Sequence, residues 1–291
     1  MSILDLLNGE RTAIFLDGAM GTQLGQAGLE MGGPNNVTNP DAVLAIHKKY
    51  VAAGVDLLIT NTLTMNRTNV ASHNVGVEVR EVNLAGARLA KEAAGQGCYV
   101  LGDMSSTGKM MKPYGPLPEE DAFATFKEQA AILAEGGVDG LIVETMFDLR
   151  EAVCAVRAAK EACDLPVIAS IAFNTAGNQG RTVMGNTARQ CAEALTEAGV
   201  VAVGANCGSV DPLEMAQLVV MMREGTSLPI IAQPNAGKGR MVDKELIFDL
   251  SPGDFAAGVQ ECVRAGARLV GGCCGTSPAH IQAMVELIGR A

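Results

Sequence analysis

The chain has 291 residues, of which 48% are hydrophobic and 3% aromatic, and its formal net charge is −10. Clustered Lys and Arg are needed to bind phosphate groups, so the charge argues against nucleic acid and anionic membranes as partners. There is no run of about 18 apolar residues, and the first segment carries acids instead of a basic region. We therefore expect no membrane span, no signal peptide and a cytoplasmic location.

Eight short apolar runs recur along the chain, and each is followed by a helix-like stretch. They are rich in Val, Ile and Leu without polar alternation, which is typical of parallel strands covered on both faces. The runs lie at residues 13–18, 55–62, 98–105, 138–145, 165–173, 200–207, 228–235 and 267–274.

The segments between these runs carry helix-start signals, namely Asn, Asp, Ser or Pro ahead of a Pro or an acidic first turn. Helices are predicted from Asn39, Pro118, Asp211, Ser251 and Ser277. Eight strand-helix units predict an α/β fold, a single-domain (β/α)8 TIM barrel over residues 1–291. The alternative, a doubly wound sheet, would need G-x-G-x-x-G after the first strand, and "DGAMGTQLG" at 17–25 does not spell it.

Three cysteines follow the strand ends, where such barrels place their chemistry. Cys207 ends the sixth run, and Cys273 with Cys274 ends the eighth, between glycines that free both thiols to face one point. Three thiolates with room for a fourth ligand describe a zinc site open for chemistry. Because Cys207 lies in no C-x-x-C motif, buried core thiols or a vicinal disulfide stay open as alternatives. The other cysteines are expected to be small buried residues: Cys98, Cys154, Cys163, Cys191 and Cys262.

Five stretches together resemble the homocysteine S-methyltransferase family. They are "LDGAMGTQL" (16–24), "ETMFDLREA" (144–152), "GANCG" (204–208), "QPNAG" (233–237) and "VGGCCGTSPAHI" (270–281). The family includes the homocysteine-binding module of cobalamin-dependent methionine synthase and the betaine and S-methylmethionine enzymes. The resemblance runs from residue 12 to the end. It implies a zinc-dependent enzyme that methylates homocysteine to methionine, with Zn²⁺ on Cys207, Cys273 and Cys274.

The same resemblance implies how the substrate is oriented. Asp17 and Glu144 would hold the ammonium of homocysteine, and the backbone amides of Ala19 and Met20 would take its carboxylate, as amides in such turns bind anions. Asn235 would fill the fourth zinc position before the substrate arrives. From the residues alone, Asp17 is equally compatible with a turn residue and Glu144 with a buried ion-pair member.

The methyl donor is the remaining question. Quaternary ammonium donors favour aromatic rings, yet we place only Tyr114, Phe147 and Phe173 at the rim, and Thr145 stands where betaine enzymes carry a tyrosine. We expect a methylated corrinoid, such as methylcobalamin, supplied by a separate protein. S-methylmethionine, another sulfonium, or betaine is the alternative donor. A hypothesis of another class is a non-catalytic zinc-binding subunit of a corrinoid methyltransferase complex.

Overall fold

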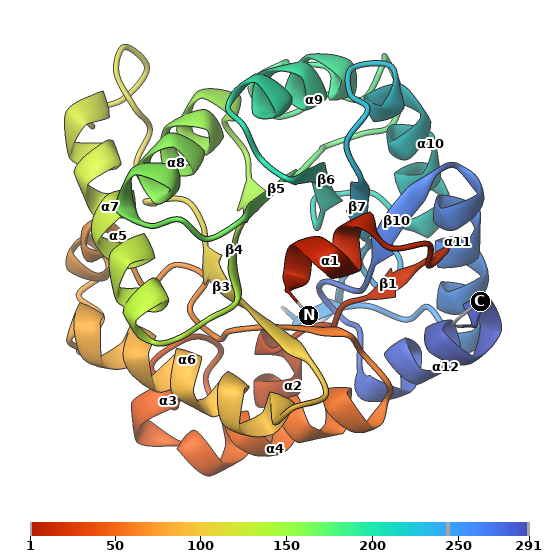
Figure 1. Cartoon of the computed structure of the whole chain (residues 1–291), viewed down its shortest axis with the longest axis horizontal. Helices are drawn as coiled ribbons and strands as arrows, with labels where there is room; N and C mark the ends of the chain where they lie inside the picture. The colour runs from red at the N-terminus through yellow and green to blue at the C-terminus, as the bar shows by residue number, and fades with distance from the viewer. Residues whose placement is uncertain (1, 243–244, 290–291) are drawn as a thin grey trace.

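The computed structural model describes residues 2–242 and 245–289, and its centre is a ring of parallel strands (Figure 1). Eight strands pair in the order β1-β10-β7-β6-β5-β4-β3-β2, and a parallel bridge between Leu16 and Leu57 joins the two ends. The predicted (β/α)8 barrel is confirmed, and each apolar run contains one strand. These are β1 (Ile14–Phe15), β2 (Leu57–Ile59), β3 (Tyr99–Met104), β4 (Gly140–Met146), β5 (Val167–Ile171), β6 (Ala202–Asn206), β7 (Ile230–Gln233) and β10 (Ala267–Val270).

A layer of helices surrounds the strands, and one apolar cluster fills the space between the two layers. The five predicted helix starts are confirmed, and the Asp211 and Ser251 side chains each accept a hydrogen bond from the first turn that follows. The surrounding helices are α4 (Pro40–Ala52), α6 (Val79–Ala94), α7 (Glu119–Glu135), α8 (Leu149–Ala162), α9 (Ala188–Glu197), α10 (Pro212–Arg223), α11 (Pro252–Arg264) and α12 (Pro278–Ile288).

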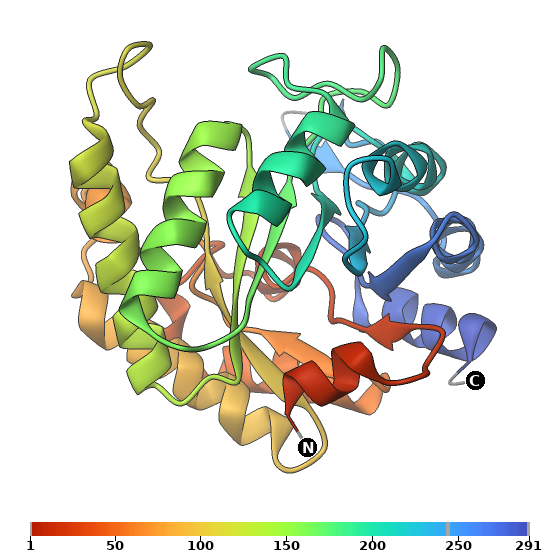
Figure 2. The same cartoon turned by 45° about the horizontal axis from the view of Figure 1, so that its top comes forward.

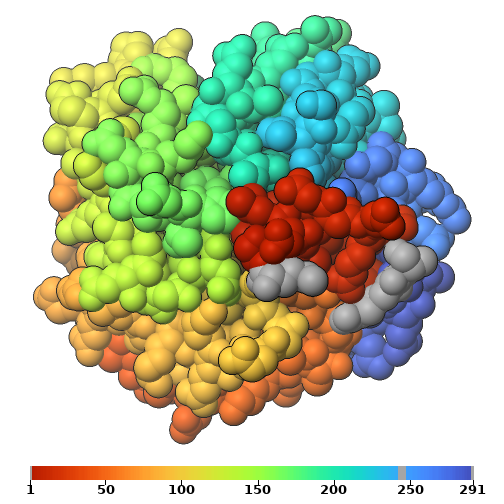
Figure 3. Space-filling view, viewed as in Figure 1, coloured from red at the N-terminus to blue at the C-terminus, as the bar shows by residue number. Residues whose placement is uncertain are grey.

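Helix α1 (Ile3–Asn8) lies across the end of the barrel where the strands begin (Figures 1 and 3). Its buried Ile3, Leu6 and Leu7 pack with a second apolar cluster of strand residues that includes Leu57 and Ile142. This helix, which the sequence analysis did not predict, covers that end of the barrel. The functional residues therefore have to be sought at the opposite end.

Further unpredicted elements follow the strand ends. These are α2 (Gly21–Gln26), α3 (Asn35–Thr38), α5 (Arg67–Ser72) and the antiparallel pair β8 (Arg240–Val242) and β9 (Glu245–Ile247). The long connections after β3 and β5 rise on the side away from α1 (Figure 2). Over the described ranges, no helix combines the length and apolar character needed to cross a bilayer.

Candidate active site

The three predicted cysteine thiols meet at one point. The Sγ atoms of Cys207 and Cys274 are 3.8 Å apart, and all three sulfurs, including that of Cys273, lie within 4.8 Å of one another. Two sulfurs bound at about 2.3 Å to a tetrahedral zinc ion are themselves about 3.8 Å apart. All eight cysteines are free, so the pair forms no vicinal disulfide. The donor set and its spacing fit zinc.

The other five cysteines, which were expected to be small buried residues, lie away from this cluster. Cys154, Cys191 and Cys262 are buried in the core, whereas Cys98 and Cys163 are half-buried and pack against it.

The end of β7 holds the cysteines in place through the backbone. The Cys207 amide donates to the Gln233 carbonyl at 3.1 Å, and the Cys273 amide donates to the Pro234 carbonyl at 2.9 Å. Cys207 itself has a φ of +54°, and Gly208 follows at +68°. A β-carbon at Gly208 would lie 2.2 Å from a backbone oxygen just beyond β5, so the chain can turn here only at a glycine.

The glycines before the cysteine pair allow the ends of β10 and β1 to touch. The Gly272 amide donates to the Asp17 carbonyl at 3.0 Å, and a β-carbon on Gly272 would lie 2.6 Å from the Thr276 side chain. The Thr276 hydroxyl donates to the Cys273 carbonyl at 2.7 Å and accepts from the Ala19 amide at 2.9 Å. The Ala19 amide is thus already bonded within the protein, whereas Met20 directly precedes α2.

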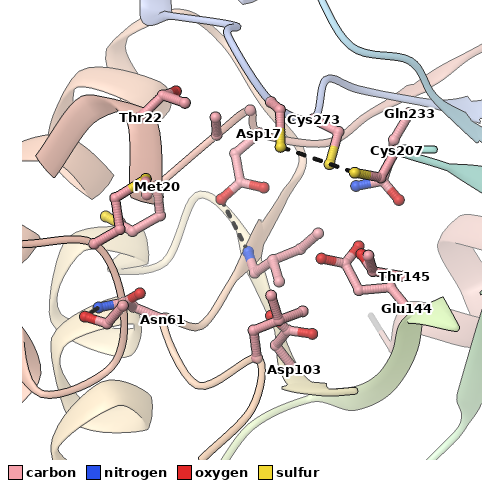
Figure 4. A pocket seen from close by; sticks show the side chains of 18 of the residues that line it. Asp17, Met20, Thr22, Asn61, Asp103, Glu144, Thr145, Cys207, Gln233 and Cys273 are labelled. Carbon is pink, nitrogen blue, oxygen red and sulfur yellow. Dashed lines mark hydrogen bonds between the residues drawn. The ribbon is translucent and has the colours of Figure 1, made fainter. Parts of the chain in front are cut away.

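A cavity of about 300 Å³ opens beside the thiols at the ends of the strands (Figure 4). Asp17, which follows β1, and Asp103 and Glu144, on β3 and β4, line this cavity together with the three cysteines. The residues described as lining it include neither Lys, Arg nor His. The three thiols and the three carboxyl groups therefore lie around one small cavity, and none of the residues described as lining it carries a positive charge.

The carboxyl groups are buried, and burial sets their protonation. It raises the pKa of Glu144 to about 7, and the negative charge of Cys274 adds to the effect. Burial also raises the pKa of Asp17 well above its usual range, although the Ile59 amide, which donates to Oδ2 at 3.0 Å, opposes the change. The same cause acts on Asp103, where the charges of Glu144 and Asp17 contribute further. Burial thus favours the neutral form of each carboxyl group, and a cation bound beside the groups would favour their ionised form.

The thiols are coupled as well. Hydrogen bonds from Cys207 and Cys273 lower the pKa of the Cys274 thiol to about 3. Hydrogen bonding to Cys207 and Cys274, together with burial, raises the pKa of Cys273 well above its usual range. The hydrogen bonds among the three thiols thus favour the thiolate form of Cys274.

Two residues at the site, Asp103 and Asn206, were given no function from the sequence. Asp103 ends a strand, which was the available signal, and it lines the cavity. Asn206 precedes Cys207 and is fully buried, where it hydrogen-bonds Ser170, Thr145 and the Cys273 sulfur. Its position inside a strand of small apolar residues gave no comparable signal.

Asn235 lies near the cysteines but is absent from the described cavity lining. Its Nδ2 donates to the Gly208 carbonyl at 3.0 Å, and its buried Oδ1 has no hydrogen-bond partner. Gln233, the last residue of the same strand β7, lines the cavity instead. The assignment of Asn235 to the fourth zinc position stays a prediction.

A second cavity, of about 520 Å³, adjoins the first, with which it shares Leu63, Thr64 and Thr145. Phe147 lines this second cavity and is 43% exposed, whereas Tyr114 is exposed but lines neither cavity. The placement of Phe173 at the rim is wrong, because its ring is fully buried in the core between the barrel and the helices. Of the three aromatic residues placed at the rim, one adjoins the site.

Comparison with known proteins identifies a family and relatives to which this chain is similar. Residues 14–288 match the model of the family described as homocysteine S-methyltransferase. The chain is 30% identical to the methionine synthases of Mycobacterium leprae (strain TN) and Mycobacterium tuberculosis (strain ATCC 25618 / H37Rv). These alignments cover 94% and 99% of this chain but 24% and 25% of the two relatives, so the chain spans about a quarter of their length.

Solved structures show the same fold. The metallated form of the homocysteine methyltransferase MmuM from Escherichia coli superposes with a TM-score of 0.80 at 22% identity, covering 98% of this chain and 99% of that one. Its apo form gives a TM-score of 0.76 at 23% identity, with the same coverage.

Proposed function

The chain belongs to the homocysteine S-methyltransferase family, and from this membership we propose that it methylates the thiol of homocysteine to give methionine. One observation carries the proposal. The cavity has three thiols on one wall and buried carboxyl groups facing them. Homocysteine has the complementary ends, a thiol and an ammonium group, separated by a short apolar chain.

We propose that Cys207, Cys273 and Cys274 hold zinc, because their sulfurs have the spacing of ligands on a tetrahedral ion and leave a fourth position. When bound, zinc would keep the substrate thiol deprotonated at neutral pH, which supplies the nucleophile for methyl transfer. The contribution of the chain is to hold the three ligands in place. Cys207 follows β6, and the cysteine pair follows β10. Backbone carbonyl groups at the end of β7 accept hydrogen bonds from the amides of Cys207 and Cys273.

Asp17 and Glu144 are proposed to bind the substrate ammonium. The Ile59 amide fixes the orientation of Asp17, and the buried Oε2 of Glu144 has no protein partner. The Met20 amide, in the glycine-rich turn before α2, is proposed to bind the carboxylate. The Ala19 amide can join it only if Thr276 gives up its hydrogen bond. Asn235, with its unpartnered Oδ1, is proposed to occupy the fourth zinc position before substrate binds.

A methylated corrinoid carried by a separate protein is the proposed methyl donor. The 30% identical relatives are methionine synthases, of which this chain spans about a quarter. Among the residues described as lining the two cavities, Phe147 is the one Phe, Tyr or Trp side chain. A single aromatic ring is too few to surround a quaternary ammonium donor. The second cavity supports docking from the rim, because it continues the first cavity toward the surface loops.

The test is to incubate the zinc-loaded protein and homocysteine separately with methylcobalamin, S-methylmethionine and betaine, and to follow methionine. We expect methylcobalamin to give the fastest turnover. Turnover on betaine at least as fast would contradict the corrinoid donor, and a sulfonium faster than methylcobalamin would replace it. Absence of turnover with every donor and of any homocysteine-dependent protection against heat would favour the non-catalytic zinc-binding subunit.

A further inference from the structure

Asp103 has hydrogen bonds to both its backbone groups, whereas Oδ1 of its carboxyl group has no partner among the residues that the structure describes. Its amide donates to the Thr60 hydroxyl at 2.9 Å, and its carbonyl accepts from the Thr62 hydroxyl at 2.8 Å. The residue is 4% exposed, and its buried Oδ1 has no hydrogen bond. The side chain points into the same cavity as Asp17 and Glu144 (Figure 4).

An unpaired buried carboxyl group is costly, so its presence needs an explanation. A structural aspartate at this depth would be expected to accept hydrogen bonds from the protein, as Glu151 does from Thr107 and Ser106. Glu144 repeats the pattern, because its Oε2 is also buried without a partner. The described lining includes no basic side chain, so the unpaired Oδ1 of Asp103 points to a ligand in the cavity as its partner.

A primary ammonium group has three N–H donors, and three carboxyl groups line this cavity. We propose that Asp103 is a third ammonium-binding residue, which with Asp17 and Glu144 restricts the enzyme to thiols that carry a free primary amino group. This inference rests on the proposed function, because it assumes that the substrate sulfur binds at the cysteine cluster. It adds a specificity-determining residue on β3 to those suggested by the sequence.

The ligand class follows from the donor count. A quaternary ammonium group has no N–H donor and would leave the carboxyl oxygens unpaired, whereas a thiol without an amino group would bring no positive charge. We therefore expect Asp103 to distinguish homocysteine from 4-mercaptobutyrate, which keeps the thiol and carboxylate but lacks the amino group.

The experiment measures thiol binding without turnover. The zinc is replaced by cobalt(II), and the sulfur-to-cobalt absorption is titrated with homocysteine or with 4-mercaptobutyrate. The comparison covers the unmodified protein, Asp103→Asn, and Asp148→Asn as a matched control. Asp148 caps α8 and lines the second cavity but not the first, so it is outside the thiol site that this donor-free titration measures. Asn caps helices equally well, so the control removes a carboxylate without removing the cap.

We expect Asp103→Asn to raise the Kd for homocysteine at least tenfold, about 1.4 kcal/mol. The Kd for 4-mercaptobutyrate should change less than about threefold, and Asp148→Asn should change neither value. A homocysteine Kd within about threefold of the unmodified protein would overturn the proposal, as would equal losses for both thiols. If Asp103→Asn fails to fold, Asp103→Ser is judged by the same values.

A failure of the proposed function would give a different result in the same titration. In that case neither thiol alters the cobalt spectrum of the unmodified protein, and the inference on Asp103 falls with it. If both thiols alter the spectrum of the unmodified protein, the thiol site stands. The variants then decide on Asp103 alone.

Discussion

Asn206 and Thr145 are joined by two hydrogen bonds between neighbouring parts of the site. The Thr145 amide donates to Asn206 Oδ1 at 2.8 Å, and Asn206 Nδ2 donates to the Thr145 hydroxyl at 2.7 Å. Thr145 needs this support, since its φ of +56° is unfavourable for a β-branched residue. The pair links the residue after Glu144 with the residue before Cys207.

Replacing Asn206 with Ala should therefore damage both sides of the site. We expect a loss of about 2–4 kcal/mol in the free energy of unfolding, because several buried hydrogen bonds disappear and polar partners are left unpaired. Homocysteine binding by the fraction that stays folded should weaken as well. Urea denaturation measures the first effect, and a loss below about 0.5 kcal/mol would show that the pair is unimportant.

Each cysteine of the cluster should be needed for metal binding. Cys207→Ala, Cys273→Ala and Cys274→Ala should each lose zinc and methyltransferase activity together, because a site with two protein thiolates binds zinc poorly. Metal analysis of the purified variants checks this, with Cys163→Ala, away from the cluster, as the control that keeps its zinc. Full activity after Cys274→Ala would rule out the proposed zinc site.

Glu144→Gln should separate substrate binding from metal binding. We expect the Kd for homocysteine to rise at least tenfold through loss of a charged hydrogen bond worth about 1.5–3 kcal/mol, while the zinc content stays unchanged. Calorimetry with homocysteine and 4-mercaptobutyrate provides the measurement, and the second thiol should bind both proteins alike. If the variant instead loses its zinc, Glu144 supports the metal site and does not bind the ammonium.

Asp103→Asn should stabilise the substrate-free protein at neutral pH. An unfolded aspartate ionises near pH 4, whereas burial and the neighbouring charges of Glu144 and Asp17 raise the pKa of folded Asp103 well above that. The folded state thus loses stability as pH rises above about 4, and the variant escapes this loss. At pH 7 we expect the melting temperature of the zinc-loaded variant to rise by at least about 2 °C.

The gain should shrink toward zero as the pH falls below about 4, because Asp103 then becomes protonated in the unfolded chain as well as in the folded one. Scanning calorimetry across this range is the measurement. A variant less stable than the parent at pH 7 would mean that Asp103 stabilises the fold, against the view that it serves a ligand.

Leu7→Ala should lower stability without changing the chemistry. Leu7 is 3% exposed on α1, within the apolar cluster of strand residues, so we expect a loss of about 2–5 kcal/mol. The turnover number per folded molecule should stay that of the parent, since the cavity lies at the other end of the barrel. Unchanged stability would show that α1 does not contribute to the core.

The barrel and the cysteine cluster could be predicted because they depend on local signals. Each strand was a continuous apolar run, and Cys207 with the pair ended two of these runs. Helix α1 is too short to show a helical period. It packs on strand residues that come together only when the barrel closes. Asn206 and Asp103 depend on contacts between strands distant in sequence, so the sequence offered Asp103 only as a strand-end acid and Asn206 not at all.

The carboxyl-lined wall has a consequence for the end of the catalytic cycle. Methionine keeps the same ammonium and carboxylate as homocysteine, so interactions with Asp17 and Glu144 hold product and substrate alike and cannot help the product to leave. Only the sulfur differs, since the thioether of methionine carries no negative charge. The strength of product inhibition should consequently depend on the cysteine cluster, because the methyl group on sulfur is the difference between bound product and bound substrate.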